Sequence, residues 1–244
     1  MTDALFAVTR LAEIYDFVEE ERDDLDHYLA IAAELGARSV LDVGCGTGTL
    51  ACLLAERGIE VVGVDPAAAS LDVAQAKPGA QRVRWLHGDA TTLPQLQVDL
   101  ATMTANVSHV ILTDEDWSAT LHGIHGALRP GGHLAFEARD PAREPWQEWN
   151  RDDTYQSLDI PGVGAVETWW DLTEVNGDYV SYRRTYVFAA DGATLTSDST
   201  RRFRGRAEIE GSLRSAGYML VDVHDAPDRP NYEWIFIARA PASD

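Results

Sequence analysis

The chain has 244 residues, of which 45% are hydrophobic, enough for the core of one large domain. Forty acidic against twenty basic residues give a formal net charge of -20, and such a surface repels the phosphate backbone of nucleic acids, which excludes most nucleic-acid partners. No stretch approaches the roughly twenty apolar residues of a membrane span, and no secretory signal pattern is present, so we expect a cytoplasmic protein without a membrane partner.

Two helices are expected ahead of the first strand. Apolar residues recur at helical intervals over residues 5–18 and again over residues 25–35, and Gly36 ends the second segment. Between residues 13 and 26, eight acidic residues stand against Arg22 alone. We expect a solvated helix face there, and a lid that favours a cationic substrate is the alternative.

An apolar run and a glycine-rich turn follow at residues 39–50, Ser-Val-Leu-Asp-Val-Gly-Cys-Gly-Thr-Gly-Thr-Leu. The run suits a strand that is buried on both faces, and the glycines let the backbone turn sharply and approach a ligand. Leucines at helical spacing come next, so the turn presents a helix N-terminus. This pattern indicates a nucleotide-type cofactor site. A dinucleotide turn would need glycine at Thr49, which disfavours a nicotinamide cofactor.

Three acidic residues are expected near the ends of strands. Asp42 stands two residues ahead of the first glycine, and Asp65 and Asp89 close the second and third predicted strands. Asp65 lies nineteen residues after Gly46, a spacing at which an acid can hydrogen-bond ribose hydroxyls. The three acids suit a cofactor with an amino group, a ribose diol and an adenine amine better than they suit a pyrophosphate.

Strands and helices are then expected to alternate until the composition changes at Pro141. The predicted elements are a helix at 67–76, strands at 98–103 and 133–139 with a helix between them that carries Trp117 to Leu128, and a closing helix at 207–216 before strands at 218–223 and 231–238. Three strand-like runs at 165–175, 178–189 and 193–203 predict an antiparallel meander inserted before the last helix. Asn176-Gly177 and Asp191-Gly192 suit its two hairpin turns.

Four motifs, in this order, resemble those of the class I S-adenosylmethionine-dependent methyltransferases. They are Val-Leu-Asp-Val-Gly-Cys-Gly-Thr-Gly, Gly-Val-Asp-Pro, Gly-Asp-Ala and Leu-Arg-Pro-Gly-Gly-His-Leu. The resemblance implies an α/β fold with a doubly wound, seven-stranded, mostly parallel sheet and an antiparallel last strand. The implied single domain, 1–244, consists of a helical cap (1–37), a cofactor-binding core (38–140 and 204–240) and a substrate-capping antiparallel insertion of three strands (141–203).

The resemblance also implies S-adenosyl-L-methionine as the cofactor. Asp42 and the glycine turn would surround its methionine part, Asp65 its ribose, and Asp89 with Ala90 its adenine. The full set of expected cofactor-binding residues is Asp42, Gly44, Cys45, Gly46, Thr47, Gly48, Asp65, Pro66, Asp89, Ala90 and Asn106.

Catalytic and acceptor-binding candidates complete the expected site. Tyr15, in a Tyr-Asp pair near the N-terminus, and His109, after the fourth strand, could remove a proton from a hydroxyl acceptor. The expected substrate-binding residues are Arg139, Trp146 and Trp170. No metal is expected, because His122 and His125 have no second cluster at ligand spacing.

The sequence therefore predicts an enzyme that transfers a methyl group to the nitrogen or oxygen of a small molecule. The protein mainly has to align donor and acceptor and exclude water. A noncatalytic S-adenosylmethionine-binding regulator is one alternative, and an NAD-dependent oxidoreductase is a second. Whether the chain forms a homodimer is left open.

Overall fold

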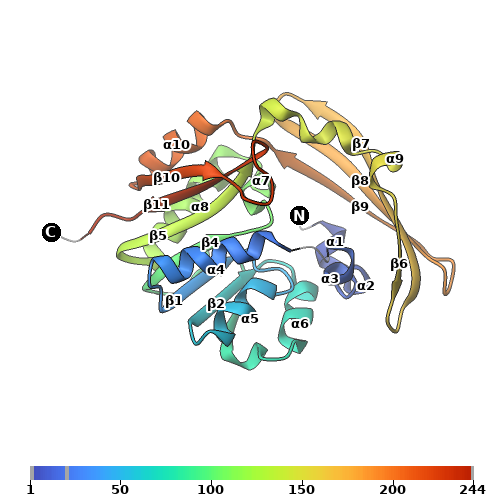
Figure 1. Ribbon diagram of the computed structural model, residues 1–244, viewed down its shortest axis with the longest axis horizontal. Coiled ribbons are helices and arrows are strands. Elements are labelled where there is room, and N and C mark those ends of the chain that lie inside the picture. The colour runs from blue at the N-terminus through green and yellow to red at the C-terminus, as the bar shows by residue number, and fades with distance from the viewer. Residues whose placement is uncertain (1–2, 20–21, 243–244) are drawn as a thin grey trace.

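The computed structural model describes residues 3–19 and 22–242 and is organised around a seven-stranded sheet (Figure 1). Its strands are β1 (Ser39–Val43), β2 (Glu60–Asp65), β3 (Val83–His87), β4 (Val98–Met103), β5 (Leu128–Arg139), β10 (Met219–Asp225) and β11 (Glu233–Arg239). They lie in the order β10-β11-β5-β4-β1-β2-β3. β11 runs antiparallel to both β5 and β10, whereas the other pairs are parallel. The predicted mostly parallel sheet with an antiparallel last strand is confirmed.

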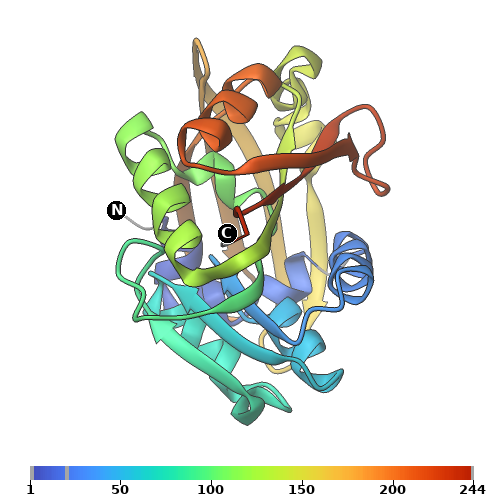
Figure 2. The same ribbon diagram turned by 90° about the vertical axis from the view of Figure 1, so that its left-hand side faces the viewer.

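Helices cover both faces of this sheet, and Figure 2 shows α4 (blue) and α8 (green) on its opposite sides. One face packs against α4 (Asp24–Glu34) and α5 (Thr49–Glu56), and the other against α8 (Asp114–Ala127) and α10 (Arg206–Ser215). Apolar residues at helical spacing explain this packing, because they form one face of each helix. In α8, for example, Trp117, Leu121 and Ile124 are at most 2% exposed. A further helix, α6 (Ala68–Ala76), packs beside β2 and β3.

The N-terminal segment differs from its prediction. Instead of one helix over residues 5–18 it forms three single turns, α1 (Ala4–Ala7), α2 (Thr9–Ala12) and α3 (Tyr15–Val18). The break falls at Val8, whose backbone is extended. Bending there lets Leu5, Leu11 and Ile14 all pack against the insertion, in a cluster with Tyr186. Tertiary packing has overridden the helical period of the sequence.

The insertion contains one strand more than predicted. Its antiparallel sheet has the order β6 (Gln156–Ile160), β7 (Gly164–Asn176), β8 (Tyr179–Phe188), β9 (Thr194–Arg202). The prediction missed β6 because this strand is short and mostly exposed, so its sequence lacks a clear apolar alternation. Asn176 pairs with Tyr179, which leaves Gly177 and Asp178 as the two turn residues. The remaining short helices are η1 (Ala80–Arg82), α7 (Val107–Val110), η2 (Pro141–Arg143), η3 (Pro145–Glu148) and α9 (Arg151–Thr154).

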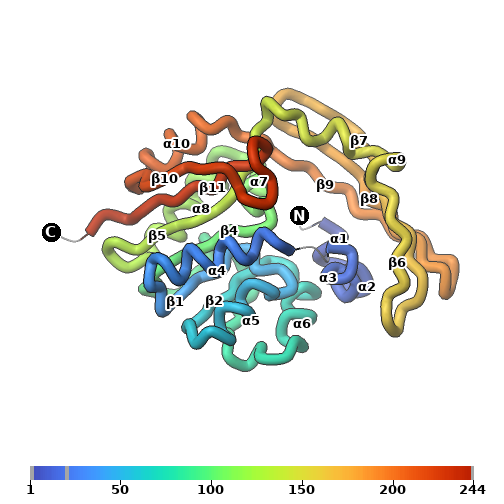
Figure 3. Tube along the Cα trace, in the orientation of Figure 1, coloured from blue at the N-terminus to red at the C-terminus, as the bar shows by residue number. Residues whose placement is uncertain are grey.

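The cap joins the two sheets. Figures 1 and 3 place α1 to α3 between the main sheet and the insertion sheet, and the trace returns from β9 to α10. The amide of Leu5 donates to Ser197 Oγ at 2.9 Å, and Arg10 forms an ion pair with Asp191 at 2.8 Å. These contacts hold the insertion over the cap. Within residues 3–19 and 22–242, no helix has the length and apolarity that a membrane crossing requires.

Candidate functional site

The glycine turn after β1 requires glycine for two reasons. Gly44, Gly46 and Gly48 all have positive φ, between 53° and 77°, which L side chains rarely adopt. A Cβ on Gly44 would also lie 2.5 Å from a methyl carbon of Val107, and one on Gly48 2.4 Å from the ring of Trp85. The turn is thus packed tightly against the residues that follow β4. Cys45, inside the turn, donates its amide to Val64 O at 3.1 Å.

Asp65 is fastened directly to this turn. Its carboxylate accepts hydrogen bonds from Gly46 N and from Ala67 N, which follows Pro66, both at 2.8 Å. The side chain is buried, and burial raises the pKa of Asp65. Each carboxylate oxygen keeps a second lone pair, so the group can also accept from a ribose diol.

Asp42 lies deeper than Asp65. It is 1% exposed and accepts a hydrogen bond from Thr102 Oγ1 at 2.9 Å. Burial raises the pKa of Asp42 to about 7. The carboxyl group thus lies between β1 and β4, behind the turn.

Asp89 and Ala90 lie beyond the end of β3, on the same edge of the sheet as Asp65. The Oδ1 atom of Asp89 accepts from the amide and the hydroxyl of Thr91, at 2.8 and 2.6 Å. Ala90 is buried, and a Cβ on Gly123 would meet its carbonyl oxygen at 2.0 Å. The exposed carboxylate of Asp89 has lone pairs left for an exocyclic amine.

The Tyr-Asp pair connects the cap to the glycine turn. Asp16 accepts a hydrogen bond from Thr47 Oγ1 at 2.6 Å and forms an ion pair with Lys77, just after α6, also at 2.6 Å. Tyr15 lines a cavity beside the turn. Burial raises the pKa of Tyr15 to about 12, so the phenol stays protonated near neutral pH. It is therefore a poor candidate for the general base.

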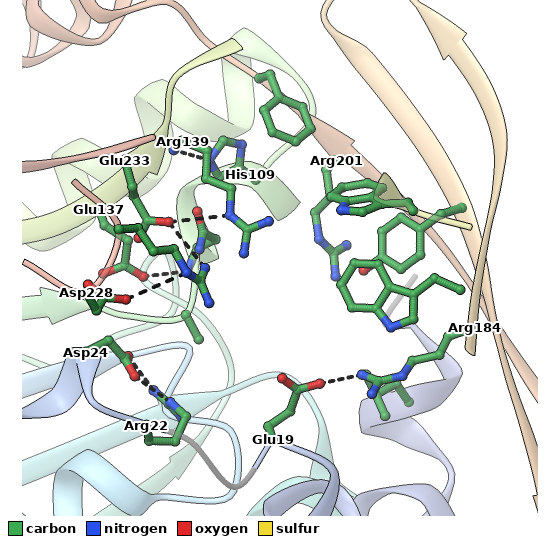
Figure 4. Close-up of a pocket in the computed structure, with 18 of the residues that line it drawn as sticks. Glu19, Arg22, Asp24, His109, Glu137, Arg139, Arg184, Arg201, Asp228 and Glu233 are labelled. Atoms are coloured by element: carbon green, nitrogen blue, oxygen red, sulfur yellow. Dashed lines mark hydrogen bonds and ion pairs between the residues drawn. The ribbon is translucent and has the colours of Figure 1, made fainter. Parts of the chain in front are cut away.

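The cavity has a volume of about 150 Å³ and is lined by the cap, the carboxyl ends of β4 and β5, the insertion and the loop before β11 (Figure 4). Its lining is rich in charged and aromatic side chains. The lining residues are Leu5, Phe6, Tyr15, Glu19, Arg22, Asp24, Ala105, Asn106, His109, Glu137, Arg139, Trp149, Trp170, Tyr182, Arg184, Arg201, Phe203, Asp228, Arg229 and Glu233.

His109 lines this cavity but has no nitrogen free for a substrate. Its Nδ1 bonds to Arg202 O at 2.9 Å, and its Nε2 accepts from the amide of Arg139 at 3.0 Å. The ring is 2% exposed, and burial followed by the charge of Arg139 lowers the pKa of His109 to about 3. These contacts contradict the expectation of a general base, and His109 instead ties β5 to β9.

The segment after β4 holds an unusual backbone. Ala105 and Asn106 have φ values of 56° and 60°, in the left-handed region that non-glycine residues rarely adopt. The amide of Asn106 donates to Glu137 Oε1 at 2.6 Å, and the Tyr28 hydroxyl donates to the other oxygen. Burial, together with the charge of Glu233, raises the pKa of Glu137 to about 8. Glu137 thus joins β5, α4 and the loop after β4.

The aromatic wall of the cavity comes from the insertion. Trp170 stacks on Tyr182 with ring centroids 4.8 Å apart, and Trp149 meets Trp170 edge-on at 5.2 Å. The expectation for Trp146 was wrong, because its ring packs against Phe203 behind the wall and is not among the lining residues. Trp149 stands in its place.

The residues that sequence reasoning missed come from segments far apart in the chain. They include Glu19 and Asp24 of the cap region, Arg184 and Arg201 of the insertion, and Glu233 of β11. Glu19 and Asp24 belong to the acidic stretch at 13–26, but no local motif places any of these residues in the cavity, since only the fold brings them together. Glu137 does have a signal, as an acid within the otherwise apolar run of β5.

Comparison with known proteins adds a second line of evidence. The family described as "Methyltransferase domain" matches residues 40–132. The cypemycin N-terminal methyltransferase of a Streptomyces species is 38% identical over 44% of this chain and 44% of its own. A malonyl-[acyl-carrier protein] O-methyltransferase of Serratia marcescens is 30% identical over 74% of this chain and 68% of its own. The chain thus spans about half the length of some of the curated relatives that it matches.

Solved structures share the whole fold. A sugar N-methyltransferase from Streptoalloteichus superposes with a TM-score of 0.78, over 99% of this chain and 96% of that one, at 19% identity. An amino pentose methyltransferase from Micromonospora echinaspora, solved with bound S-adenosylmethionine, gives a TM-score of 0.66 at 21% identity, over 90% and 92%. With these matches, the glycine turn and Asp65 identify the chain as a member of the S-adenosylmethionine-dependent methyltransferases.

Proposed function

We propose that this chain transfers the methyl group of S-adenosylmethionine to a nitrogen atom of a small molecule. The observation that carries the proposal is the position of the cavity beside the glycine turn. Val107, which follows the cavity residue Asn106, packs directly on Gly44, and Tyr15 lines the cavity while its neighbour Asp16 bonds to the turn. A cofactor at the turn and an acceptor in the cavity would therefore be adjacent.

The residues at the turn fit the proposed cofactor. Asp65 has lone pairs for the ribose hydroxyls, and Asp89 has lone pairs for the adenine amine. The sulfonium group of the cofactor supplies an electrophilic methyl group. The protein then has to orient the acceptor and exclude water, and the cap and the insertion supply walls of the cavity in which this would take place.

The polar groups of the cavity favour nitrogen over oxygen as the acceptor. A hydroxyl must lose its proton to attack, whereas a neutral amine attacks with its own lone pair. Both ring nitrogens of His109 are bound to the backbone, and the phenol of Tyr15 stays protonated near neutral pH. Neither candidate for a proton acceptor is therefore free to serve an alcohol.

A panel of matched amines and alcohols tests the proposal. The protein is incubated with S-adenosylmethionine and each compound, and both S-adenosylhomocysteine release and product mass are measured. We expect methylated amines and no methylated alcohols. Methylation of alcohols alone would contradict the choice of nitrogen. Binding of the cofactor without any methylated product would favour the noncatalytic regulator instead.

A further inference from the structure

Arg139 is a half-buried cation, and the hydrogen-bonding capacity of its buried Nε is not met by the residues described. Its closest ionic contact among them is Glu233, with 3.4 Å between Nε and Oε2, and Nε has no hydrogen-bond partner. Burial, and then the charge of Arg229, lower the pKa of Arg139. In Figure 4, Arg139 lies between Glu233 and Arg201, so its terminal nitrogens face the cavity. Oxygen atoms of a ligand there would restore the hydrogen bonds that burial removes.

Arg201 faces Arg139 from the opposite wall (Figure 4). It extends from β9, pairs with Asp3 at 3.0 Å through one terminal nitrogen, and lies 5.5 Å from the ring centroid of Tyr182. Its side chain is only 13% exposed. Two guanidinium groups directed at the same small volume repel each other, and an anion between them stabilises both, whereas a neutral hydroxyl stabilises neither.

Other arginines of the cavity are already neutralised locally. Arg22 makes two hydrogen bonds to Asp24, both 2.9 Å long, and Arg184 pairs with Glu19. Arg139, by contrast, shares Glu233 with Arg229, which approaches the same carboxylate to 3.5 Å. Arg201 also has a local partner, Asp3, so the demand for a further anion is greatest at Arg139, and Arg201 faces Arg139 across the cavity.

We propose that the methyl acceptor carries an oxyanion, a carboxylate or a phosphate, that is held between Arg139 and Arg201. The proposal rests on the function proposed above and names the chemical class of its acceptor. Because the ring of Tyr182 lies next to Arg201 and stacks on Trp170, the part of the acceptor that joins the oxyanion meets an aromatic face. The amine to be methylated would be on the same molecule.

A binding experiment with three small probes tests this subsite. The full chain, saturated with S-adenosylhomocysteine, is titrated with benzoate, phenyl phosphate and the neutral analogue benzamide, and tryptophan fluorescence and calorimetry report binding. We expect at least one anion to bind about tenfold more tightly than benzamide. Tighter binding of benzoate would indicate an acceptor with a carboxylate, and tighter binding of phenyl phosphate would indicate an acceptor with a phosphate.

Variants locate the effect. R139Q and R201Q should each abolish the preference for the anion, and R139K and R201K should restore part of it. R183Q is the matched control, because Arg183 lies on the same sheet but is exposed and pairs with Asp198. The proposal is overturned if benzamide binds as tightly as both anions, if neither anion binds, or if R139Q and R201Q keep the preference in folded protein. The titrations with the three probes are repeated without S-adenosylhomocysteine, so that the subsite is tested even if the protein does not bind this nucleoside. A failure to bind S-adenosylhomocysteine counts against the proposed function and not against the oxyanion subsite.

Discussion

At the scale of single residues, the sequence indicates which chemical groups are present but not which partners they have. His109 has the intrinsic pKa of a general base, and its position after β4 is where a catalytic residue is expected. Its two hydrogen bonds, to the backbone of residues 139 and 202, become visible only once β5 and β9 lie side by side. For Asp65, the spacing from Gly46 predicts contact with a ribose, and the hydrogen bond from Gly46 N to its carboxylate is a further contact that the spacing does not predict.

The contacts of Asp65 predict a loss of cofactor affinity on substitution. In D65A, the free energy of S-adenosylmethionine binding should weaken by roughly 1 to 3 kcal/mol, because the ribose hydroxyls lose their acceptor. Calorimetry on the variant measures this directly. D72A, which changes an exposed acid on the nearby helix α6, is the control and should bind like the original protein. Equal affinity in D65A would remove Asp65 from the cofactor site.

The contacts of His109 predict a structural defect in place of a catalytic one. H109A should lower the free energy of unfolding by roughly 1 to 3 kcal/mol, since two buried backbone groups lose their partner. The pH dependence of methyl transfer should keep its shape. Urea unfolding and a pH-rate profile measure the two quantities. Loss of an ionisation from the rate profile, in a variant as stable as the original, would show that His109 is a base after all.

At the scale of elements, the alternating core could be predicted and the site-forming additions only in part. β1 to β5 and α8 follow from apolar runs and a helical stripe that the sheet itself imposes. Residues 5–18 of the cap were predicted as one helix, but the bend at Val8 depends on packing against Tyr186, some 180 residues later. β6 has too few buried residues for an alternation of apolar and polar side chains to be recognised in its sequence. Elements that pack on distant segments carry the weaker local signals.

The link between the cap and the glycine turn gives a prediction at this scale. In D16N the ion pair to Lys77 is lost and the bond from Thr47 weakens, so α3 should hold the turn less firmly. We expect S-adenosylmethionine affinity to fall by roughly 0.5 to 1.5 kcal/mol with little change in unfolding. Calorimetry at two salt concentrations measures the loss. D26N, at an exposed position of α4, should be neutral. A normal affinity in D16N would separate the cap from cofactor binding.

At the scale of the whole molecule, an acidic chain buries several carboxyl groups in its site. Burial raises the pKa of Glu137 to about 8 and that of Asp42 to about 7, from ordinary values of 4.5 and 3.8. Between the unfolded and folded pKa, the folded protein holds protons that the unfolded chain has released. Stability is therefore highest below the unfolded pKa and falls as the pH rises through the folded one. Because Glu137 and Asp42 are partly protonated near neutral pH, they add less negative charge around the cavity than two ionised carboxylates would.

This linkage predicts how stability depends on pH. From pH 7.5 to 8.5, where His109 is largely neutral in both states, the free energy of unfolding should decrease as the pH rises. E137Q should show a smaller decrease, because glutamine does not titrate, and E115Q, at an exposed position of α8, should behave like the original protein. Urea titrations across this range measure the slopes. An unchanged slope in E137Q would mean that Glu137 is ionised throughout.

The central claim is that the glycine turn and the acids beside it hold the nucleoside and amino acid parts of S-adenosylmethionine. Isothermal titration of folded protein with S-adenosylmethionine and with S-adenosylhomocysteine tests it most directly, with NADH as the comparison. The account predicts saturable binding of both sulfur nucleosides and none of NADH. Saturable binding of NADH, with no heat from either sulfur nucleoside, would contradict it.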